Sequence, residues 1–337
     1  RQHSRRHKPL KSLAAEPAPV AIFTSEICVG HEPGWLHPDT PKRLSSLLSL
    51  MRTDWASEFG PMLRISEPEA DATEEQLLRV HTPRHLALLK DAFESAERWP
   101  LYRANIDGDT VVSPGSRAAA SRAAGLVVAA VDEVFSDSSA LKRAFVMVRP
   151  PGHHAEADRP MGFCLFNNVM VGVAHAQAVH GLGRVAVIDF DVHHGNGDAA
   201  LASPDPTRLY ASSHQSPLFP GTGLTPGRSG PHGGILSAPL PAGAGSDEFR
   251  AAWRDQLLPV VAEFGPEAIF LSSGFDAHAD DDVASLALNE DDFEWLTAEV
   301  ARLGGGHLPI ISVLEGGYNI EALVRSVQAH IRALIHV

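Results

Sequence analysis

The sequence predicts an α/β protein whose mostly parallel sheet is covered by helices on both faces. Short apolar runs, typical of buried parallel strands, alternate with amphipathic segments from residue 20 to the end of the chain. Gly- and Pro-rich segments lie only between these elements, so we expect one domain over residues 20–337. Histidines and aspartates follow several of the apolar runs, where an open parallel sheet places its binding site.

Hydrophobic periodicity defines each element in turn. Leucines and a methionine recur at intervals of three and four over 41–51 and predict a helix. A proline begins an Ala-rich helix over 114–135, and Gly181 ends a helix that starts at 168. The other helices are expected at 74–80, 85–93, 247–264, 290–303 and 321–335, and the strands at 20–23, 144–148, 185–190, 208–212, 268–272 and 309–314.

Composition excludes several classes of function. The chain of 337 residues is 44% hydrophobic and has a formal net charge of −13. It contains no apolar run near the roughly 20 residues that span a bilayer. We therefore expect neither a membrane protein nor a general nucleic-acid binder. The two cysteines, Cys28 and Cys164, suit a reducing compartment rather than a disulfide framework.

Residues 1–19 differ from the rest of the chain. Five basic residues and no acidic residue lie within the first eleven positions, and two prolines then precede the first strand. We expect a disordered basic arm, which resembles either the remnant of an organelle transit peptide or an ordinary tail. The expected location is inside the cell, in a chloroplast or mitochondrion, with the cytoplasm as the alternative.

The segment 188–197, Ile-Asp-Phe-Asp-Val-His-His-Gly-Asn-Gly, is the most informative in the chain. Residues two apart on a strand point the same way, so Asp191 and His193 can bind one ion. Carboxylate oxygen with imidazole nitrogen suits zinc or a similar divalent metal. Asp276, after the strand expected at 268–272, is the natural third ligand and leaves the open position that catalytic zinc needs. His278 is the alternative ligand, although we favour an exposed loop histidine there.

Further motifs follow other strand ends. His153 and His154 come after a rigid Pro-Pro-Gly turn and are candidates for a general base and acid. Tyr318 follows two glycines, whose flexible backbone would let its phenol swing toward the metal and stabilise an oxyanion. The long Gly/Pro-rich segment 214–234 is expected to be an active-site loop.

Together these motifs resemble those of the zinc-dependent histone deacetylase and acetylpolyamine amidohydrolase family. The resemblance runs from about residue 26 to the C-terminus, with RPPGHHA at 149–155, GFCLFNN at 162–168, IDFDVHHGNG at 188–197, FPGTG at 219–223, SSGFDAH at 272–278 and EGGYN at 315–319. It implies a class II-like member, similar to plastid and bacterial ones. It also implies the arginase/deacetylase fold, a single domain with a mostly parallel eight-stranded sheet.

The resemblance implies two metal sites. Asp191, His193 and Asp276 would bind one catalytic zinc ion. The same ligands accept ferrous iron and cobalt, so the metal used in the cell stays open. A structural potassium ion would be held by the backbone oxygens of Asp189, Asp191 and His193, the hydroxyl of Ser212 and the carbonyl of Ser213.

The resemblance also implies the catalytic roles. His153 and His154 would be the tandem histidines, with His154 as the general base and acid. Asp189 would hydrogen-bond His153 and fix its tautomer. Asn196 stands behind His154 where class I members carry aspartate, so His154 should be less basic than in those enzymes. Tyr318 would polarise the acetyl carbonyl.

The substrate tunnel follows from the same resemblance. Phe163 and Phe219 would form its aromatic walls, and Gly162 would line it through its backbone. Arg43 matches an arginine at the inner channel through which acetate leaves. Val283 stands where one branch of polyamine deacetylases carries an acidic gatekeeper, and an apolar residue favours acetyl-lysine or a neutral acetamide. The aspartates at 280–282 could attract cations, although such a run is usually a solvated loop.

The sequence thus predicts a zinc-dependent deacetylase that hydrolyses N-acetyl amides with metal-activated water. Acetyl-lysine in proteins is the favoured substrate, and a small acetamide, such as an N-acetyl arylalkylamine or an acetylpolyamine, is the alternative. An arginase-like hydrolase would need further carboxylates around Asp276. A non-catalytic acyl-lysine reader would lack Tyr318 or one of the tandem histidines. The oligomeric state stays open.

Overall fold

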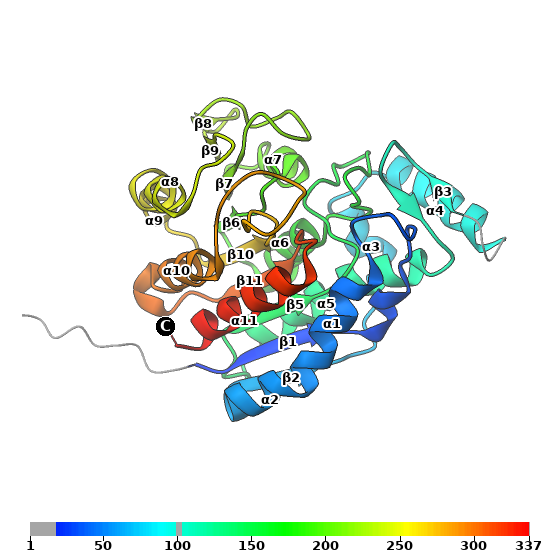
Figure 1. Ribbon diagram of the computed structural model, residues 1–337, viewed down its shortest axis with the longest axis horizontal. Helices are drawn as coiled ribbons and strands as arrows, with labels where there is room; N and C mark the ends of the chain where they lie inside the picture. Colours follow the sequence, from blue (N-terminus) through cyan, green and yellow to red (C-terminus); the bar gives the residue numbers. More distant parts are fainter. Residues whose placement is uncertain (1–17, 99–102, 337) are drawn as a thin grey trace, which may run out of the picture.

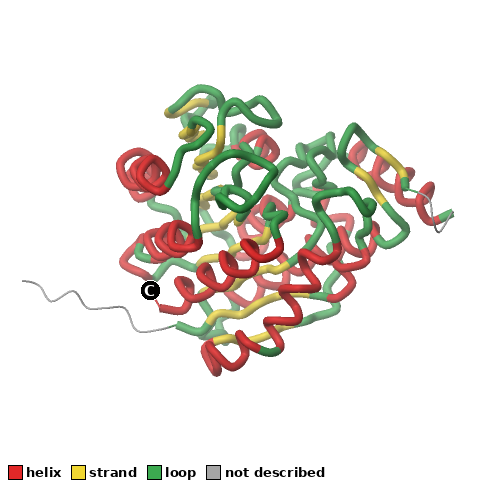
Figure 2. Tube along the Cα trace, viewed as in Figure 1, coloured by secondary structure: helices red, strands yellow, loops and turns green. Residues whose placement is uncertain are grey.

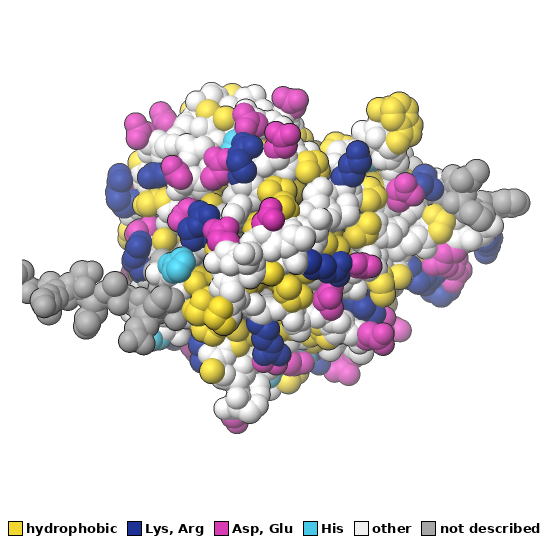
Figure 3. Space-filling view, turned by 60° about the horizontal axis from the view of Figure 1, so that its bottom comes forward, with side chains coloured by type: hydrophobic (Ala, Val, Ile, Leu, Met, Phe, Trp, Pro, Cys, Tyr) yellow, Lys and Arg dark blue, Asp and Glu magenta, His cyan; other side chains and the backbone are white. Residues whose placement is uncertain are grey.

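The structure is a computed structural model in which residues 18–98 and 103–336 are described. The expected basic arm lies outside these residues, apart from its last two positions. No helix in the described part of the chain is long and apolar enough to cross a membrane. Among the described residues on the face drawn in Figure 3, acidic and basic side chains are interspersed with apolar ones.

A nine-stranded sheet runs through the molecule in the order β2-β1-β5-β11-β10-β6-β7-β9-β8. Neighbouring strands pair in parallel except β8 and β9. Eight strands are therefore parallel, and β8 adds an antiparallel edge. The bounds are β1 (Val20–Thr24), β2 (Leu63–Ser66), β5 (Arg143–Met147), β6 (Val185–Asp189), β7 (Arg208–Gln215), β8 (Gly227–Ser229), β9 (Ile235–Leu240), β10 (Ala268–Ser273) and β11 (Ile310–Leu314).

Helices cover both faces of the sheet (Figures 1 and 2). One layer contains α1 (Pro41–Arg52), α10 (Glu290–Ala301) and α11 (Ile320–His336), and the other contains α5 (Ser116–Phe135) and α6 (Asn168–His180). The smaller helices are α2 (Asp54–Phe59), α3 (Glu74–Leu78), α4 (Pro83–Glu97), α7 (Asn196–Ala202), α8 (Ser246–Ala251) and α9 (Leu258–Phe264), with a π-helical segment η3 (Ala252–Leu257). The 3-10 turns are η1 (Glu26–Gly30), η2 (Gly60–Met62) and η4 (Leu303–Gly306), and β3 (Ala104–Asn105) pairs with β4 (Val111–Val112).

The central strands form the core because most of their residues are apolar. Every residue of β5, β6, β10 and β11 is buried. Gly172 lets α6 pack closely on both neighbours, since a Cβ there would lie 2.5 Å from the side chain of Val127 and 2.9 Å from the ring of Phe270. The helix layer and the sheet therefore share one packed core.

The sequence patterns missed three strands of the large sheet, the β3–β4 pair, the short helices α2 and α7 and one helix break. β2 is a half-exposed edge strand of only four residues, and β9 contains Pro239, so neither shows the apolar run of a central strand. β7 extends to Gln215 and β8 occupies 227–229, so the segment 214–234 is only partly a loop. The helix expected at 247–264 is interrupted by the π-helical segment.

The strands that precede the motifs end together at one edge of the sheet. Asp189 of β6 is in register with Ser212 of β7 and Ser272 of β10, and β10 is in turn paired with β11. The segments that follow these strands are 190–197, 216–223, 274–278 and 315–319, and the tandem histidines follow β5, the next strand along. The fold thus gathers the sequence motifs at the carboxyl edge.

Candidate active site

Three buried side chains meet just beyond the ends of β6 and β10. His193 Nδ1 lies 3.0 Å from Asp191 Oδ1 and 3.2 Å from Asp276 Oδ2. One ligand atom from each residue lies within 4.8 Å of the other two. Asp276 Oδ2 is buried and has no hydrogen-bond partner, which leaves an oxygen free for an ion.

Glycines make room for this group, and backbone amides orient it. A Cβ at Gly274 would lie 1.9 Å from Asp191 Oδ2, and one at Gly316 would lie 2.2 Å from Asp276 Oδ2. Gly316 N–H donates to Asp191 Oδ2 and Val192 N–H donates to Asp276 Oδ1, both at 2.9 Å. Two oriented carboxylates, one imidazole and one unpaired oxygen fit a divalent cation such as zinc.

The charges of the ligand group also suit a cation. Burial and the neighbouring Asp191 raise the pKa of Asp276 to about 6. Burial lowers the pKa of His193, but contact with Asp191 and Asp276 outweighs it and raises the pKa to about 10. A proton on His193, which is hydrogen-bonded to Asp191, therefore offsets part of the negative charge of the two carboxylates in the protein alone. A bound metal would replace that proton, so metal binding should release it.

The tandem histidines have different neighbours. His153 Nδ1 lies 3.1 Å from Asp189 Oδ2, and His154 Nδ1 lies 2.8 Å from Asn196 Oδ1. Burial opposes a charge on both rings. At His153 the carboxylates of Asp191 and Asp189 outweigh burial and raise its pKa well above the usual value. At His154 the adjacent His153 adds to burial, so its pKa lies well below.

The network around Asn196 fixes the tautomer of His154. Asn196 Nδ2 donates to Glu156 Oε1 at 2.7 Å, so its Oδ1 faces the imidazole. That oxygen can only accept, which places the ring proton of His154 on Nδ1. Nε2 of His154 is left with a lone pair, as a general base requires.

The loop that carries Tyr318 is held by Arg43. The guanidinium of Arg43 is fully buried and donates to the carbonyls of Gly317 and Glu315 and to Asp39 Oδ1. It also lies 4.9 Å from the centre of the Tyr318 ring. All three guanidinium nitrogens of Arg43 thus donate hydrogen bonds to other residues of the protein. The flexible backbone expected before Tyr318 is hydrogen-bonded in place.

Aromatic side chains surround the histidines. The ring of Phe219 lies edge-on to that of His154, with centroids 5.1 Å apart, and Phe163 lies 5.8 Å from Tyr318 in the same arrangement. Gly162 has a φ of +58°, and a Cβ there would lie 2.5 Å from the ring of His154. The tunnel residues expected from the sequence therefore lie beside the catalytic candidates.

The segment after Asp276 differs from the sequence expectation. His278 is only 4% exposed, so the interpretation as an exposed loop histidine was wrong. It lies outside the ligand group, with Nδ1 accepting from Asp280 N–H at 3.0 Å. The aspartate run is not simply a solvated loop either, because Asp281 is 5% exposed. Half-buried Val283 lines a pocket of ≈ 350 Å³ with both Asp281 and Tyr318.

The expected potassium ligands come from neighbouring strands. Asp189 on β6 is paired in register with Ser212 on β7, and both are fully buried. The hydroxyl of Ser212 lies 2.9 Å from His214 Nδ1, and that of Ser213 accepts from Trp253 Nε1 at 2.8 Å. The structure thus places Asp189 and Ser212 side by side, with Ser213 next along β7.

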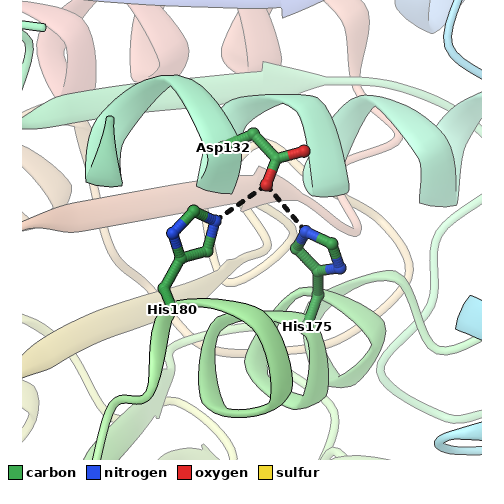
Figure 4. A group of neighbouring side chains, drawn as sticks. All are labelled: Asp132, His175 and His180. Atoms are coloured by element: carbon green, nitrogen blue, oxygen red, sulfur yellow. Dashed lines mark hydrogen bonds and ion pairs between the residues drawn. The ribbon is translucent and has the colours of Figure 1, made fainter. Parts of the chain in front are cut away.

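A second group of histidine and aspartate links α5 and α6 (Figure 4). Asp132 Oδ1 lies 2.7 Å from His175 Nε2 and 2.8 Å from His180 Nε2. Arg79, which can only donate, contacts His175 Nδ1 at 3.0 Å. The proton of His175 therefore lies on Nε2 and leaves no lone pair there for a metal. This group is a hydrogen-bonded tie between two helices.

Comparison with known proteins agrees with this geometry. Residues 37–334 match the family described as the histone deacetylase domain. The chain belongs to the histone deacetylase family. Histone deacetylase 14, chloroplastic, of Arabidopsis thaliana is 34% identical over 93% of this chain and 76% of its own length. A histone deacetylase-like amidohydrolase of Pseudomonas aeruginosa is 35% identical over 89% of this chain and 82% of its own length.

A solved structure shows the same fold. The crystal structure of the HDA15 HD domain superposes with a TM-score of 0.84 and 30% identity, covering 94% of this chain and 88% of the other. The arginase/deacetylase-type α/β fold expected from the motifs is therefore confirmed. This family member is accordingly a hydrolase of the deacetylase and amidohydrolase type.

Two buried residues of the site were not predicted as functional. Tyr210 donates to Asp189 Oδ2 at 2.8 Å, although in the sequence it is only one more apolar residue of a strand. Glu315 Oε2 accepts from Gly152 N–H at 2.7 Å and from His153 N–H at 3.1 Å. Its position in the EGGYN motif was the signal that could have identified it.

Proposed function

We propose that the chain is a zinc-dependent deacetylase that hydrolyses N-acetyl amides, with acetyl-lysine in proteins as its substrate. The unpaired oxygen of Asp276 carries this proposal, because it lies within a buried ligand set typical of catalytic zinc. The ring of His193 in that set lies 5.8 Å from the ring of His154, the candidate base.

Asp191, His193 and Asp276 would hold the ion. A divalent metal bound there would polarise an acetyl carbonyl and lower the pKa of a water molecule. Three protein ligands leave a coordination position open, which distinguishes catalytic zinc sites from closed structural ones.

Proton transfer is assigned to His154. Its lowered pKa keeps the ring neutral before reaction, and its free Nε2 can accept the proton of the attacking water. The imidazolium that results is a strong acid in this buried setting and can protonate the leaving amine. His153, held by Asp189, would stay charged and add positive potential beside the developing oxyanion.

Tyr318 would donate its phenol proton as a hydrogen bond to that oxyanion. Burial and the nearby Asp276 raise the pKa of Tyr318 well above its usual value. The phenol therefore keeps its proton at neutral pH and is a donor throughout the reaction. A donor placed for the oxyanion stabilises the transition state more than the substrate.

Val283 at the mouth of the site favours acetyl-lysine over a polyamine. Val283 offers no charge, and Asp280 Oδ2 is paired with Arg325 at 2.8 Å. Asp281 is buried and accepts hydrogen bonds from the backbone. Neither Asp280 nor Asp281 therefore presents a free carboxylate to a second ammonium group. Asp282 is exposed and lines the same pocket, so its carboxylate is the feature that a polyamine could still use. A small neutral acetamide would fit the same features and is the alternative substrate.

The substrate is tested by measuring kcat/KM for acetate release by the zinc-loaded protein. Three probes are compared: an acetyl-lysine peptide, a monoacetylated polyamine and an N-acetyl arylalkylamine. The peptide is expected to give the highest value, and a higher value for a small amide would move the substrate to that class. A Val283→Asp variant should gain polyamine hydrolysis, whereas Val283→Asn, which is polar but uncharged, should not. Absence of hydrolysis with every probe would overturn the proposal.

A potassium site and an organelle location of the protein are proposed together with this activity. We infer that Asp189, Asp191, His193, Ser212 and Ser213 hold a potassium ion, supported by the register of β6 and β7. Replacing potassium chloride by choline chloride should then lower the melting temperature of the protein.

An organelle location is supported by the chloroplastic name of the Arabidopsis relative. Imaging the fluorescently tagged natural gene product tests it.

A further inference from the structure

The segment that carries Tyr318 is fixed by single hydrogen bonds rather than by regular structure. Residues 315–319 lie between β11 and α11. Glu315 N–H donates to Ser273 O at 3.0 Å, and Gly316 O accepts from Phe275 N–H at 3.0 Å. Gly316 N–H donates to the zinc-ligand candidate Asp191. These bonds fix only the first half of the segment.

A single carboxylate accepts from both backbone amides of the second half, where Asn319 Nδ2 also donates to the carbonyl of Asp280 at 2.8 Å. Asp281 Oδ2 accepts from Tyr318 N–H at 2.6 Å and from Asn319 N–H at 3.0 Å. Asp281 Oδ1 accepts from Val283 N–H at 3.2 Å. The side chain of Asp281 is buried, and it is the fifth residue after Asp276, outside the ligand set. One oxygen thus faces the tyrosine segment and the other faces the pocket mouth.

We propose that Asp281 is a positioning residue that holds Tyr318 in its catalytic position and links it to Val283 at the pocket mouth. This inference rests on the proposed function, in which Tyr318 stabilises the oxyanion. Asp281 acts through the backbone and touches no reacting atom. Its negative charge is satisfied by three backbone N–H donors rather than by a cation.

The segment needs such a contact because the preceding backbone is permissive. Gly317 has a φ of +118°, a conformation that favours glycine, and a glycine backbone can also adopt other conformations. Arg43 binds the carbonyls of Glu315 and Gly317 from one side, and Asp281 binds the following N–H groups. The guanidinium of Arg43 thus holds carbonyl groups of the segment, and the carboxylate of Asp281 holds its amide groups. Loss of Asp281 would leave the amides of Tyr318 and Asn319 without the acceptor that they share.

Both oxygens of Asp281 are required by this arrangement. An asparagine has nearly the same shape but only one acceptor oxygen, and its NH₂ group would face an N–H donor. Asp281→Asn therefore can serve either the tyrosine segment or Val283, not both. This makes it a sharper variant than alanine, since it leaves no cavity in the buried site.

The first test compares Asp281→Asn with Asp280→Asn in the zinc-loaded protein. Asp280 loses the same charge, but its exposed side chain contacts Arg325 rather than the tyrosine segment. Asp281→Asn should lower kcat on the order of 10-fold, part of the effect of losing an oxyanion donor, with KM and zinc content nearly unchanged. Asp280→Asn should keep wild-type kcat. An equal loss of kcat in both variants would overturn the proposal.

A double-mutant cycle with Tyr318→Phe tests whether the effect passes through the phenol. Tyr318→Phe alone should lower kcat on the order of 10²-fold. Adding Asp281→Asn to it should cause little further loss, since the group that Asp281 positions is already absent. If the two losses multiplied, Asp281 would act independently of Tyr318 and the proposal would be wrong.

Hydrogen–deuterium exchange tests the contact without using catalysis. In metal-free protein, the amides of Tyr318 and Asn319 should exchange faster in Asp281→Asn than in wild type or Asp280→Asn. Unchanged exchange would overturn the positioning role. A wild type that hydrolyses no acetyl amide, yet shows this exchange difference, would refute the proposed function while retaining the structural role of Asp281.

Discussion

At the scale of single residues, two adjacent histidines differ because their partners differ. Asp189 gives His153 a charged acceptor, whereas Asn196 gives His154 a neutral one. Burial opposes a charge on both rings. At His153 the carboxylates of Asp191 and Asp189 outweigh burial and raise the pKa, whereas at His154 the adjacent His153 adds to burial and the pKa is lowered despite the hydrogen bond with Asn196. One ring is thus suited to carry positive charge and the other to accept a proton.

Replacing Asn196 by aspartate tests this division. The single change would set a carboxylate against Glu156, which now accepts from Asn196 at 2.7 Å. The double variant Asn196→Asp/Glu156→Gln keeps that hydrogen bond with its direction reversed. A charge beside Nδ1 should raise the pKa of His154, so the acidic limb of the kcat/KM profile should move to higher pH. Glu156→Gln alone is the control, and a limb that stays in place would contradict the role of His154.

At the scale of elements, a buried ion cluster fixes the start of α1 against the loop after β5. Asp39 accepts from Arg43 at 2.6 Å and from Arg149 at 2.7 Å, and all three side chains are fully buried. Burial alone would raise the pKa of Asp39, but the two guanidinium groups lower it well below its usual range. Arg43 and Arg149 flank the tyrosine and tandem-histidine loops, so the cluster also aligns the site.

Asp39→Asn should strongly destabilise the fold. Two buried guanidinium groups would lose their counter-ion, which costs about 3–5 kcal/mol of unfolding free energy in other proteins. Glu26→Gln is the matched control, because Glu26 pairs with Arg52 on the surface, with side chains 70% and 43% exposed. That pair should contribute about 1 kcal/mol at most. Urea unfolding measures both, and equal effects would contradict the importance of the cluster.

At the scale of the whole molecule, buried neutral histidines make stability depend on pH. Burial, with the charge of Arg149, lowers the pKa of His31 to about 3, and burial lowers those of His81 and His330 to about 3 as well. In the unfolded chain each would titrate near 6.5. Between these values the unfolded state binds more protons than the folded one. The free energy of unfolding should therefore fall as the pH drops from 6.5 toward 3.

The metal-free protein should lose up to about 1.4 kcal/mol per pH unit for each of these histidines. His330 is the clearest test, since it is fully buried between the hydroxyls of Thr297 and Ser312. His330→Gln should reduce the slope of unfolding free energy against pH by about one proton. An unchanged slope between pH 6.5 and 5 would show that His330 does not contribute to the pH dependence of the unfolding free energy.

Strands and motifs with a local signal were predictable from the sequence. β5, β6, β10 and β11 are mostly apolar. The residues that follow them carry the chemistry, so both the sheet and its functional edge could be inferred. β2 and β9 could not, because an edge strand and a strand with a proline lack that signal. Asp191 and His193 follow one strand, and the structure brings Asp276 to them from the next.

Residues that act through long-range contacts left no local pattern. Asp39 and Arg149 are separated by 110 positions, and Asp281 and Tyr318 by 37. In the sequence Asp281 was one of three aspartates in a run, which is typical of a solvated loop. Burial alone distinguishes it from its neighbours. Such pairings come from the packing of strands, which a local pattern does not contain.

Metal dependence is the most direct test of the central claim. Acetate release from an acetyl-lysine peptide would be followed in purified protein before chelation, after chelation and after one equivalent of zinc is returned, with bound zinc counted by mass spectrometry. Wild type should bind one catalytic zinc, lose its activity when the metal is removed and regain it when zinc is returned. Asp276→Asn should neither bind the zinc ion nor regain activity when zinc is added. Undiminished hydrolysis by the metal-free protein would contradict a zinc-dependent deacetylase.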